Sequence, residues 1–90
     1  MAKTIEQVKE FVSKARDENE WQVQFAEETV IPFLQYPTWI VTTAYLGRSP
    51  HVKHRLVRDL VVEKDFQLHM FDVTELIHLN QTNSGGKANG

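Results

Sequence analysis

The chain has 90 residues, of which 41% are hydrophobic and 24% are charged, and this composition predicts one globular domain with a single core. The absence of cysteine excludes a disulfide framework and a thiolate zinc site. No apolar stretch approaches the roughly 20 residues that cross a bilayer, and the first residues lack the apolar run of a signal peptide. We therefore expect a cytoplasmic protein without a membrane partner. Because so short a chain buries only a small core, we also expect a homodimer.

Residues 4–16 carry apolar side chains at the spacing of a helix with one buried face. These side chains are Ile5, Val8, Phe11, Val12 and Ala15. Thr4 precedes the apolar stripe and Gln7 follows three residues later, which is the pattern of a capping box at a helix start. The sequence therefore predicts a helix over residues 4–16.

From residue 21 the apolar spacing changes to two. Apolar residues alternating with glutamines are Trp21, Val23 and Phe25. Alternation is typical of a strand with one buried face. A helix over residues 19–31 stays open as the alternative, because no tight-turn signal follows the alternating residues. Residues 29–35 indicate a second strand, which would lie at an edge or a bulge because Pro32 cannot donate to a ladder.

Residues 38–46 are rich in β-branched and aromatic residues and predict the central strand of a sheet. One face of this strand would carry Trp39, Val41, Thr43 and Tyr45, and the other Ile40, Thr42, Ala44 and Leu46. Both faces are partly apolar. We therefore expect the strand to be covered on both sides.

Residues 49–61 predict a helix. Ser49 and Pro50 suit its first positions, and the apolar residues that follow fit a broad helical stripe. The alternative is a hairpin whose arms lie at residues 60–62 and 66–70.

The end of the chain predicts three further segments. Residues 66–70 alternate between apolar and polar side chains, which indicates a fourth strand. Asp72 and Glu75 have the spacing of a capping box, and a short helix through residue 79 is expected after it. Residues 81–90 are polar and rich in glycine, which indicates a flexible tail.

The predicted element order is therefore α-β-β-β-α-β-α. This order indicates an α+β fold, with one mostly antiparallel sheet packed against helices in a single domain over residues 1–80.

The charges are distributed unevenly along the chain, although the net charge is only -2. Residues 1–30 hold four bases and seven acids, residues 31–58 hold four bases and no acid, and residues 59–90 hold two bases and five acids. A basic middle segment in an acidic chain predicts a local contact with an anionic partner.

Six side chains of this segment are the candidate binding residues: Arg48, His51, Lys53, His54, Arg55 and Arg58. If the segment is a helix, its first residues gather cations where backbone N–H groups already favour an anion. The alternative is a solvated polar face neutralised by acids from elsewhere in the chain. Acidic residues at the far end, Glu63 and Asp65, also oppose a helix dipole, so it stays open that the segment is not a helix.

No catalytic, metal or cofactor site is predicted. His51 and His54 form a His-x-x-His pair, but the spacing and the missing glutamate differ from a zinc protease motif. Neither Ser13 nor Ser49 lies in a nucleophile elbow or beside a recognisable base. We therefore expect a protein that is not an enzyme.

The sequence favours a small binding protein, either an adaptor, an inhibitor or a regulator, that contacts an acidic protein through the basic segment. The alternative is a nucleic-acid-binding regulator that uses the same segment. In that case Trp39 and Tyr45, on one face of the central strand, would be candidates for stacking on bases or for an interface.

Overall fold

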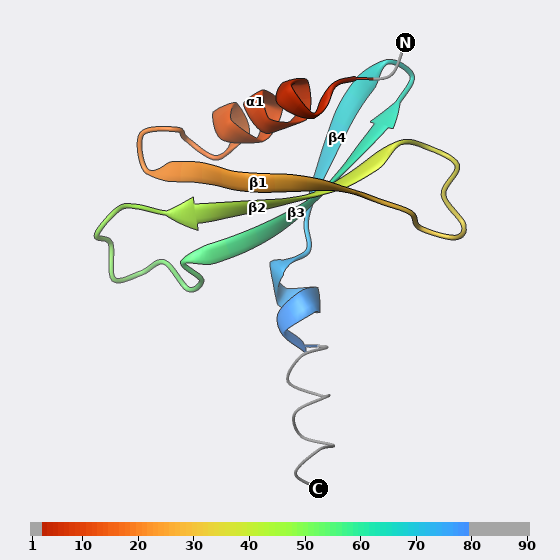
Figure 1. Ribbon diagram of the computed structural model, residues 1–90. Helices are drawn as coiled ribbons and strands as arrows, with labels where there is room; N and C mark the ends of the chain where they lie inside the picture. Colours follow the sequence, from red (N-terminus) through yellow and green to blue (C-terminus); the bar gives the residue numbers. More distant parts are fainter. Residues whose placement is uncertain (1–2, 80–90) are drawn as a thin grey trace, which may run out of the picture.

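The computed structural model describes residues 3–79. Its elements in chain order are α1 (Ile5–Ala15), β1 (Trp21–Thr29), β2 (Thr38–Tyr45), β3 (Leu56–Lys64) and β4 (Gln67–Asp72), followed by a helix over residues 74–79 (Figure 1). The α+β fold with one antiparallel sheet against helices is confirmed, and the element order is α-β-β-β-β-α. The predicted tail over residues 81–90 lies outside the described residues.

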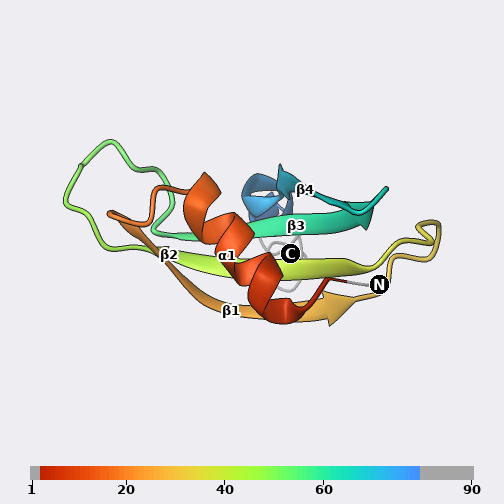
Figure 2. The same ribbon diagram turned by 90° about the horizontal axis from the view of Figure 1, so that it is seen from above.

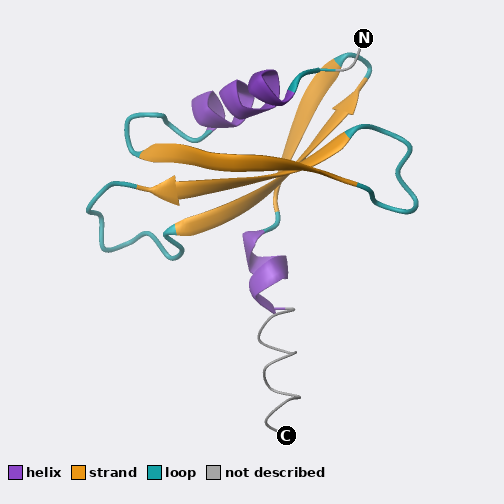
Figure 3. Ribbon diagram, in the orientation of Figure 1, coloured by secondary structure: helices purple, strands orange, loops and turns teal. Residues whose placement is uncertain are grey.

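The sheet is a meander in which strands that are consecutive in the chain are neighbours, in the order β1-β2-β3-β4. Helix α1 crosses one face of the sheet (Figure 2), which we call the covered face. The helix over residues 74–79 projects from the other side, which we call the open face (Figure 3). Neither helix within residues 3–79 has the length and apolar character needed to cross a bilayer.

Helix α1 begins as the sequence predicts. The Thr4 side chain accepts a hydrogen bond from the Gln7 backbone N–H, and the Gln7 side chain accepts one from the Thr4 backbone N–H. These two bonds satisfy donors that a helix start otherwise leaves without partners. The apolar stripe of α1 then places Val8 and Val12, both fully buried, against the covered face.

The core lies between α1 and the covered face. Its buried members are Val8, Val12, Ala26, Trp39, Val41 and Val61. Because side chains alternate along a strand, the residues of β2 and β3 on this face are every second residue. The core is therefore one layer thick. On the open face Thr38, Thr42 and Val62 are also buried, but they lie outside this cluster.

Two predictions in the first half of the chain have different outcomes. The strand predicted from residue 21 is confirmed, and it continues to Thr29 in place of the alternative helix. The second strand predicted over residues 29–35 is wrong, because residues 30–37 form the connection between β1 and β2. Pro32 and Pro37 lack the N–H that a ladder requires, which accounts for a loop here.

The helix predicted over residues 49–61 is also wrong. Residues 48–55 are a loop, and Leu56–Lys64 form β3, so the alternative hairpin describes this region better. The apolar residues of β3 do not alternate strictly, because acids occupy two buried positions on the covered face. The same apolar residues therefore also fit the spacing of a helix. These acids are Asp59 and Glu63, which are 0% and 8% exposed.

Each buried acid of β3 has a partner from the start of the chain. The Arg16 guanidinium donates to both carboxylate oxygens of Asp59, at 3.1 and 2.7 Å, and its Nη2 donates to Asp72 at 2.8 Å. The backbone N–H of Lys3 donates to Glu63 Oε1 at 2.7 Å. Arg16 follows the last residue of α1, so its side chain links the end of this helix to β3 and β4.

Arg16→Met should lower the free energy of unfolding by about 3–5 kcal/mol, because Asp59 is left buried without a counter-charge. Urea denaturation measures this change. The double variant Arg16→Met with Asp59→Leu removes both charges and should recover much of the loss. A loss below about 1 kcal/mol in the single variant would contradict the dependence of Asp59 on Arg16.

The turn between β3 and β4 holds Phe66 in an unfavourable conformation. Lys64 pairs with Gln67, so the turn has only two residues, Asp65 and Phe66, with φ angles of 55° and 63°. Two positive φ angles define a type I′ turn, for which glycine is preferred at the second position. A bulky side chain is rarely found there, and Phe66 is also 77% exposed.

Phe66→Gly should therefore stabilise the protein by about 1 kcal/mol, because glycine adopts a positive φ without the steric penalty of a Cβ atom. In a domain of this size, the expected rise in melting temperature is about 4–8 °C. Circular dichroism during heating measures it. Phe33→Gly is the matched control, since Phe33 is 96% exposed and its φ is not positive. An equal rise in the control would contradict the explanation.

Candidate functional site

The connection between β2 and β3, residues 46–55, contains five of the six predicted binding residues; we call it the basic loop. Three hydrogen bonds anchor it. The Ser49 backbone N–H donates to the Tyr45 hydroxyl at 3.1 Å, the Tyr45 N–H donates to the Arg55 carbonyl at 2.8 Å, and the Leu46 N–H donates to the Glu20 carbonyl at 2.7 Å. The loop is therefore attached to its own strand ends and to the residue before β1.

Two residues of the loop have local roles that differ from a helix start. A Cβ atom at Gly47 would overlap the Tyr45 hydroxyl, so only glycine allows the Tyr45 side chain to reach Ser49. Ser49 does not cap a helix. Its side chain accepts a hydrogen bond from the His51 N–H at 3.2 Å, which closes a local turn.

One carboxylate neutralises part of the basic loop. Glu75 Oε1 lies 2.8 Å from the Lys53 Nζ and 2.9 Å from the His54 Nε2. The His54 ring also stacks on the ring of His78, with centroids 4.4 Å apart. Lys53 and His54 are therefore held against the first turn of the helix over residues 74–79.

The other basic side chains of the loop have no acidic partner among residues 3–79. Arg48, His51 and Arg55 are exposed, and none of the ion pairs found among residues 3–79 includes them. The Arg55 guanidinium lies over the Tyr45 ring, 5.8 Å from its centroid. These side chains form the unneutralised part of the loop.

Arg58 is separated from the other predicted residues. It lies on β3 opposite Thr42, on the open face, where it is half-buried. Because residues 48–55 are not helical, backbone N–H groups do not converge on an anion in the way the sequence predicted. The candidate surface therefore consists of loop side chains.

Trp39 and Tyr45 are core residues. They are 2% and 6% exposed, and they lie on the covered face of β2. The Tyr45 ring packs against the Trp21 ring, with centroids 4.9 Å apart. This burial corrects the prediction that Trp39 and Tyr45 offer a stacking surface to bases, because α1 covers the strand face that carries them.

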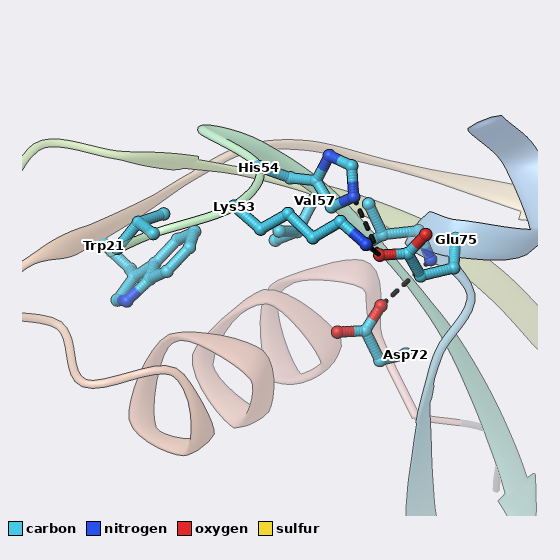
Figure 4. A pocket seen from close by; sticks show the side chains of 8 residues that line it. Trp21, Lys53, His54, Val57, Asp72 and Glu75 are labelled. Atoms are coloured by element: carbon cyan, nitrogen blue, oxygen red, sulfur yellow. Dashed lines mark hydrogen bonds and ion pairs between the residues drawn. The ribbon is translucent and has the colours of Figure 1, made fainter. Parts of the chain in front are cut away.

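A shallow cavity of ≈ 320 Å³ lies between the basic loop and the start of the last helix (Figure 4). Its lining combines the predicted Lys53 and His54 with residues that sequence reasoning missed as site residues. The additional residues are Trp21, Val52, Val57, Asp72, Thr74 and Glu75. Asp72 and Glu75 were assigned only to a capping box, and no sequence signal places them beside Lys53.

Hydrogen bonds hold the two carboxylates of this cavity in their charged form. Partial burial acts to raise the pKa of Asp72, but hydrogen bonds from Arg16 and from Thr74 lower it from 3.8 to about 2. Hydrogen bonds from Lys53 and His54 likewise lower the pKa of Glu75. Asp72 also accepts a hydrogen bond from the Thr74 N–H at 2.9 Å, so it caps the last helix.

The site is suited to binding charged groups. Among residues 3–79, no three His, Asp or Glu side chains come together in an arrangement that could hold a metal ion.

Comparisons with protein-family models, with curated proteins and with solved structures found no match to this chain.

The stabilisation contributed by Asp72 should depend on pH. Its folded pKa is lowered from 3.8 to about 2, so the stabilisation is complete well above pH 3.8 and is lost as the pH falls toward 2. Urea denaturation of the wild type and of Asp72→Asn over this range measures it. The difference in the free energy of unfolding between the wild type and Asp72→Asn should become smaller as the pH falls. A difference that stays constant would contradict the lowered pKa.

Proposed function

We propose that the protein is a non-enzymatic adaptor, inhibitor or regulator that binds an acidic protein through the basic loop. The observation that carries this proposal is that Arg48, His51 and Arg55 are exposed and lack an ion-pair partner among the described residues. In a chain with a net charge of -2, these basic side chains lie in a segment without acids, residues 31–58. Charges arranged in this way steer an acidic partner toward one surface.

The anchoring of the loop supports binding rather than simple solvation. Because hydrogen bonds to Tyr45 and Glu20 fix both ends of the loop, less conformational entropy is lost when a partner binds. Arg55 is further oriented by the Tyr45 ring. A guanidinium held in this way can bind a carboxylate through two parallel hydrogen bonds.

Glu75 supplies an internal example of the same recognition. Its carboxylate lies on Lys53 and His54, so this half of the loop already binds an acid from its own chain. A carboxylate of the partner would bind to the half with Arg48 and Arg55. Glu75 therefore limits the number of cations that the partner meets.

A nucleic acid is the alternative partner for the same loop. The burial of Trp39 and Tyr45 removes the base-stacking surface that the sequence suggested, so phosphate contacts would have to supply the affinity. Such binding falls steeply with salt concentration, because each neutralised phosphate releases counterions. An acidic protein is the simpler proposal for so few cations.

The homodimer expected from the chain length is part of the proposal. A 90-residue chain with one core layer gains stability from shared apolar surface. A cytoplasmic location stays a prediction from the sequence.

Arg48→Glu combined with Arg55→Glu should weaken binding to a fluorescent poly-glutamate peptide about tenfold, because two attractive contacts become repulsive. Glu75→Gln should strengthen binding, since it releases Lys53 and His54. Fluorescence anisotropy measures both changes. The same titration with a single-stranded oligonucleotide of equal charge, repeated at several salt concentrations, tests the alternative.

The matched control is Lys9→Glu with Lys14→Glu, which makes the same change in net charge on α1. This control should bind the peptide nearly as well as the wild type. Equal weakening by the control would mean that net charge and not the loop determines binding. Tighter binding of the oligonucleotide with a steep salt dependence would favour a nucleic acid over a protein partner.

A further inference from the structure

The open face of the sheet is apolar along its centre. Ile40 of β2 lies opposite Leu60 of β3, and Leu60 lies opposite Phe71 of β4. Phe71 is 55% exposed, and Phe25 of β1, on the same face, is 46% exposed. An antiparallel sheet with one solvated face normally carries polar residues on that face. The exposed apolar side chains here therefore indicate a surface that packs against another apolar surface.

The helix over residues 74–79 extends this apolar surface at an angle to the sheet. It projects from the open face (Figures 1 and 3). Ile77 lines a small cavity with Leu56 and Arg58, so this side of the helix lies against β3. Leu76 and Leu79, three residues apart on one side of the helix, are 59% and 57% exposed. We call the surface formed by the open face and by Leu76 and Leu79 of this helix the apolar corner.

The sheet face alone is too small for a dimer interface of standard size. At about 200 Å² per side chain, Phe25 and Phe71 alone expose roughly 200 Å² of apolar surface. Four strands about 4.8 Å apart and about eight residues long give a sheet face of roughly 500 Å². A dimer of standard size needs about 800 Å² from each partner, so the helix arm is required to complete the interface.

The length of the helix matches the distance expected between the sheets of two stacked copies. A helix of six residues rises about 9 Å, and stacked sheets lie about 10 Å apart. The helix of each copy can therefore span the gap to the sheet of the other. Leu34 and Tyr36 of the connection between β1 and β2 line a cavity with Phe71 and cover one end of this face. Residues 80–90 contain no large apolar side chain that could cover the rest.

The charges of the open face select one orientation. Glu27 lies on β1 at one edge, whereas Arg58 and Lys64 lie on β3 and His69 lies on β4. A two-fold axis parallel to the strands places β1 of one copy over β4 of the other, so Glu27 lies on the side of the other copy that carries His69. An axis perpendicular to the strands would place Glu27 of one copy near Glu27 of the other, and the two carboxylates would repel each other.

We propose that a second copy of this chain occupies the corner, in a two-fold dimer whose axis runs parallel to the strands. The helix over residues 74–79 of each copy packs on the open face of β1 and β2 in the other, near Phe25. This assignment rests on the homodimer of the proposed function and identifies its surface. The basic loop stays outside the interface, so its binding to an acidic partner can be tested separately.

Sedimentation equilibrium should give twice the monomer mass of 10.5 kDa for the wild type. Phe71→Glu should raise the dimer dissociation constant by about 30-fold or more, as for a central hot-spot residue. Phe33→Glu is the matched control, because Phe33 is 96% exposed and lies in the connection between β1 and β2, outside the strands of the open face. Melting curves confirm that both variants are folded.

Crosslinking tests the orientation, and the absence of native cysteine makes it specific. A mixture of the single variants Phe25→Cys and Leu76→Cys should form a covalent dimer of one copy of each under mild oxidation, whereas a mixture of Phe25→Cys and Phe33→Cys should not. A wild type that stays monomeric overturns both the homodimer and this surface. A dimer that resists Phe71→Glu and gives no Phe25–Leu76 crosslink overturns the surface alone.

Discussion

The ion pair between Arg16 and Asp59 is the interaction on which the rest of the structure depends. Asp59 is fully buried on the covered face, where an unpaired carboxylate would be strongly destabilising. Arg16 follows the end of α1, 43 residues before Asp59. Its guanidinium lies over the Trp21 ring, and this contact helps to hold it in place. This pair therefore fixes the position of α1 on the sheet. It also selects the register of β3, since a shift by one residue would move Asp59 to the open face.

The same guanidinium connects the core to the candidate site. Arg16 also binds Asp72, the last residue of β4 and the cap of the helix over residues 74–79. The first turn of that helix carries Glu75, which holds Lys53 and His54 of the basic loop. Contacts therefore connect the end of α1 to the loop, through Asp72 and the first turn of the last helix. The loop owes its arrangement to side chains that are distant in sequence, and two of its five basic side chains already bind an acid of the same chain.

The two faces of the sheet differ in burial, and the proposed binding surfaces lie outside the core. The covered face holds the core, and it buries Trp39 and Tyr45 that would otherwise be suited to contacts with a ligand. The open face keeps Phe71 and Phe25 exposed, and the basic loop extends beyond the strand ends. Binding an acidic partner at the loop and a second copy at the open face would use different surfaces. The two events are therefore compatible on one molecule.

The sequence by itself determined the elements whose signals are local. The capping box of Thr4 and Gln7, the alternation of β1 and the β-branched composition of β2 were sufficient to predict them, and they indicated the α+β class. The cations of the basic loop were also visible in the sequence. Only the tertiary structure decided that residues 56–64 are a strand, because Asp59 occupies a buried position with a partner 43 residues away. It likewise decided which cations are neutralised and which face of β2 is covered. Those outcomes depend on where α1 and the last helix pack, and no local pattern encodes that packing.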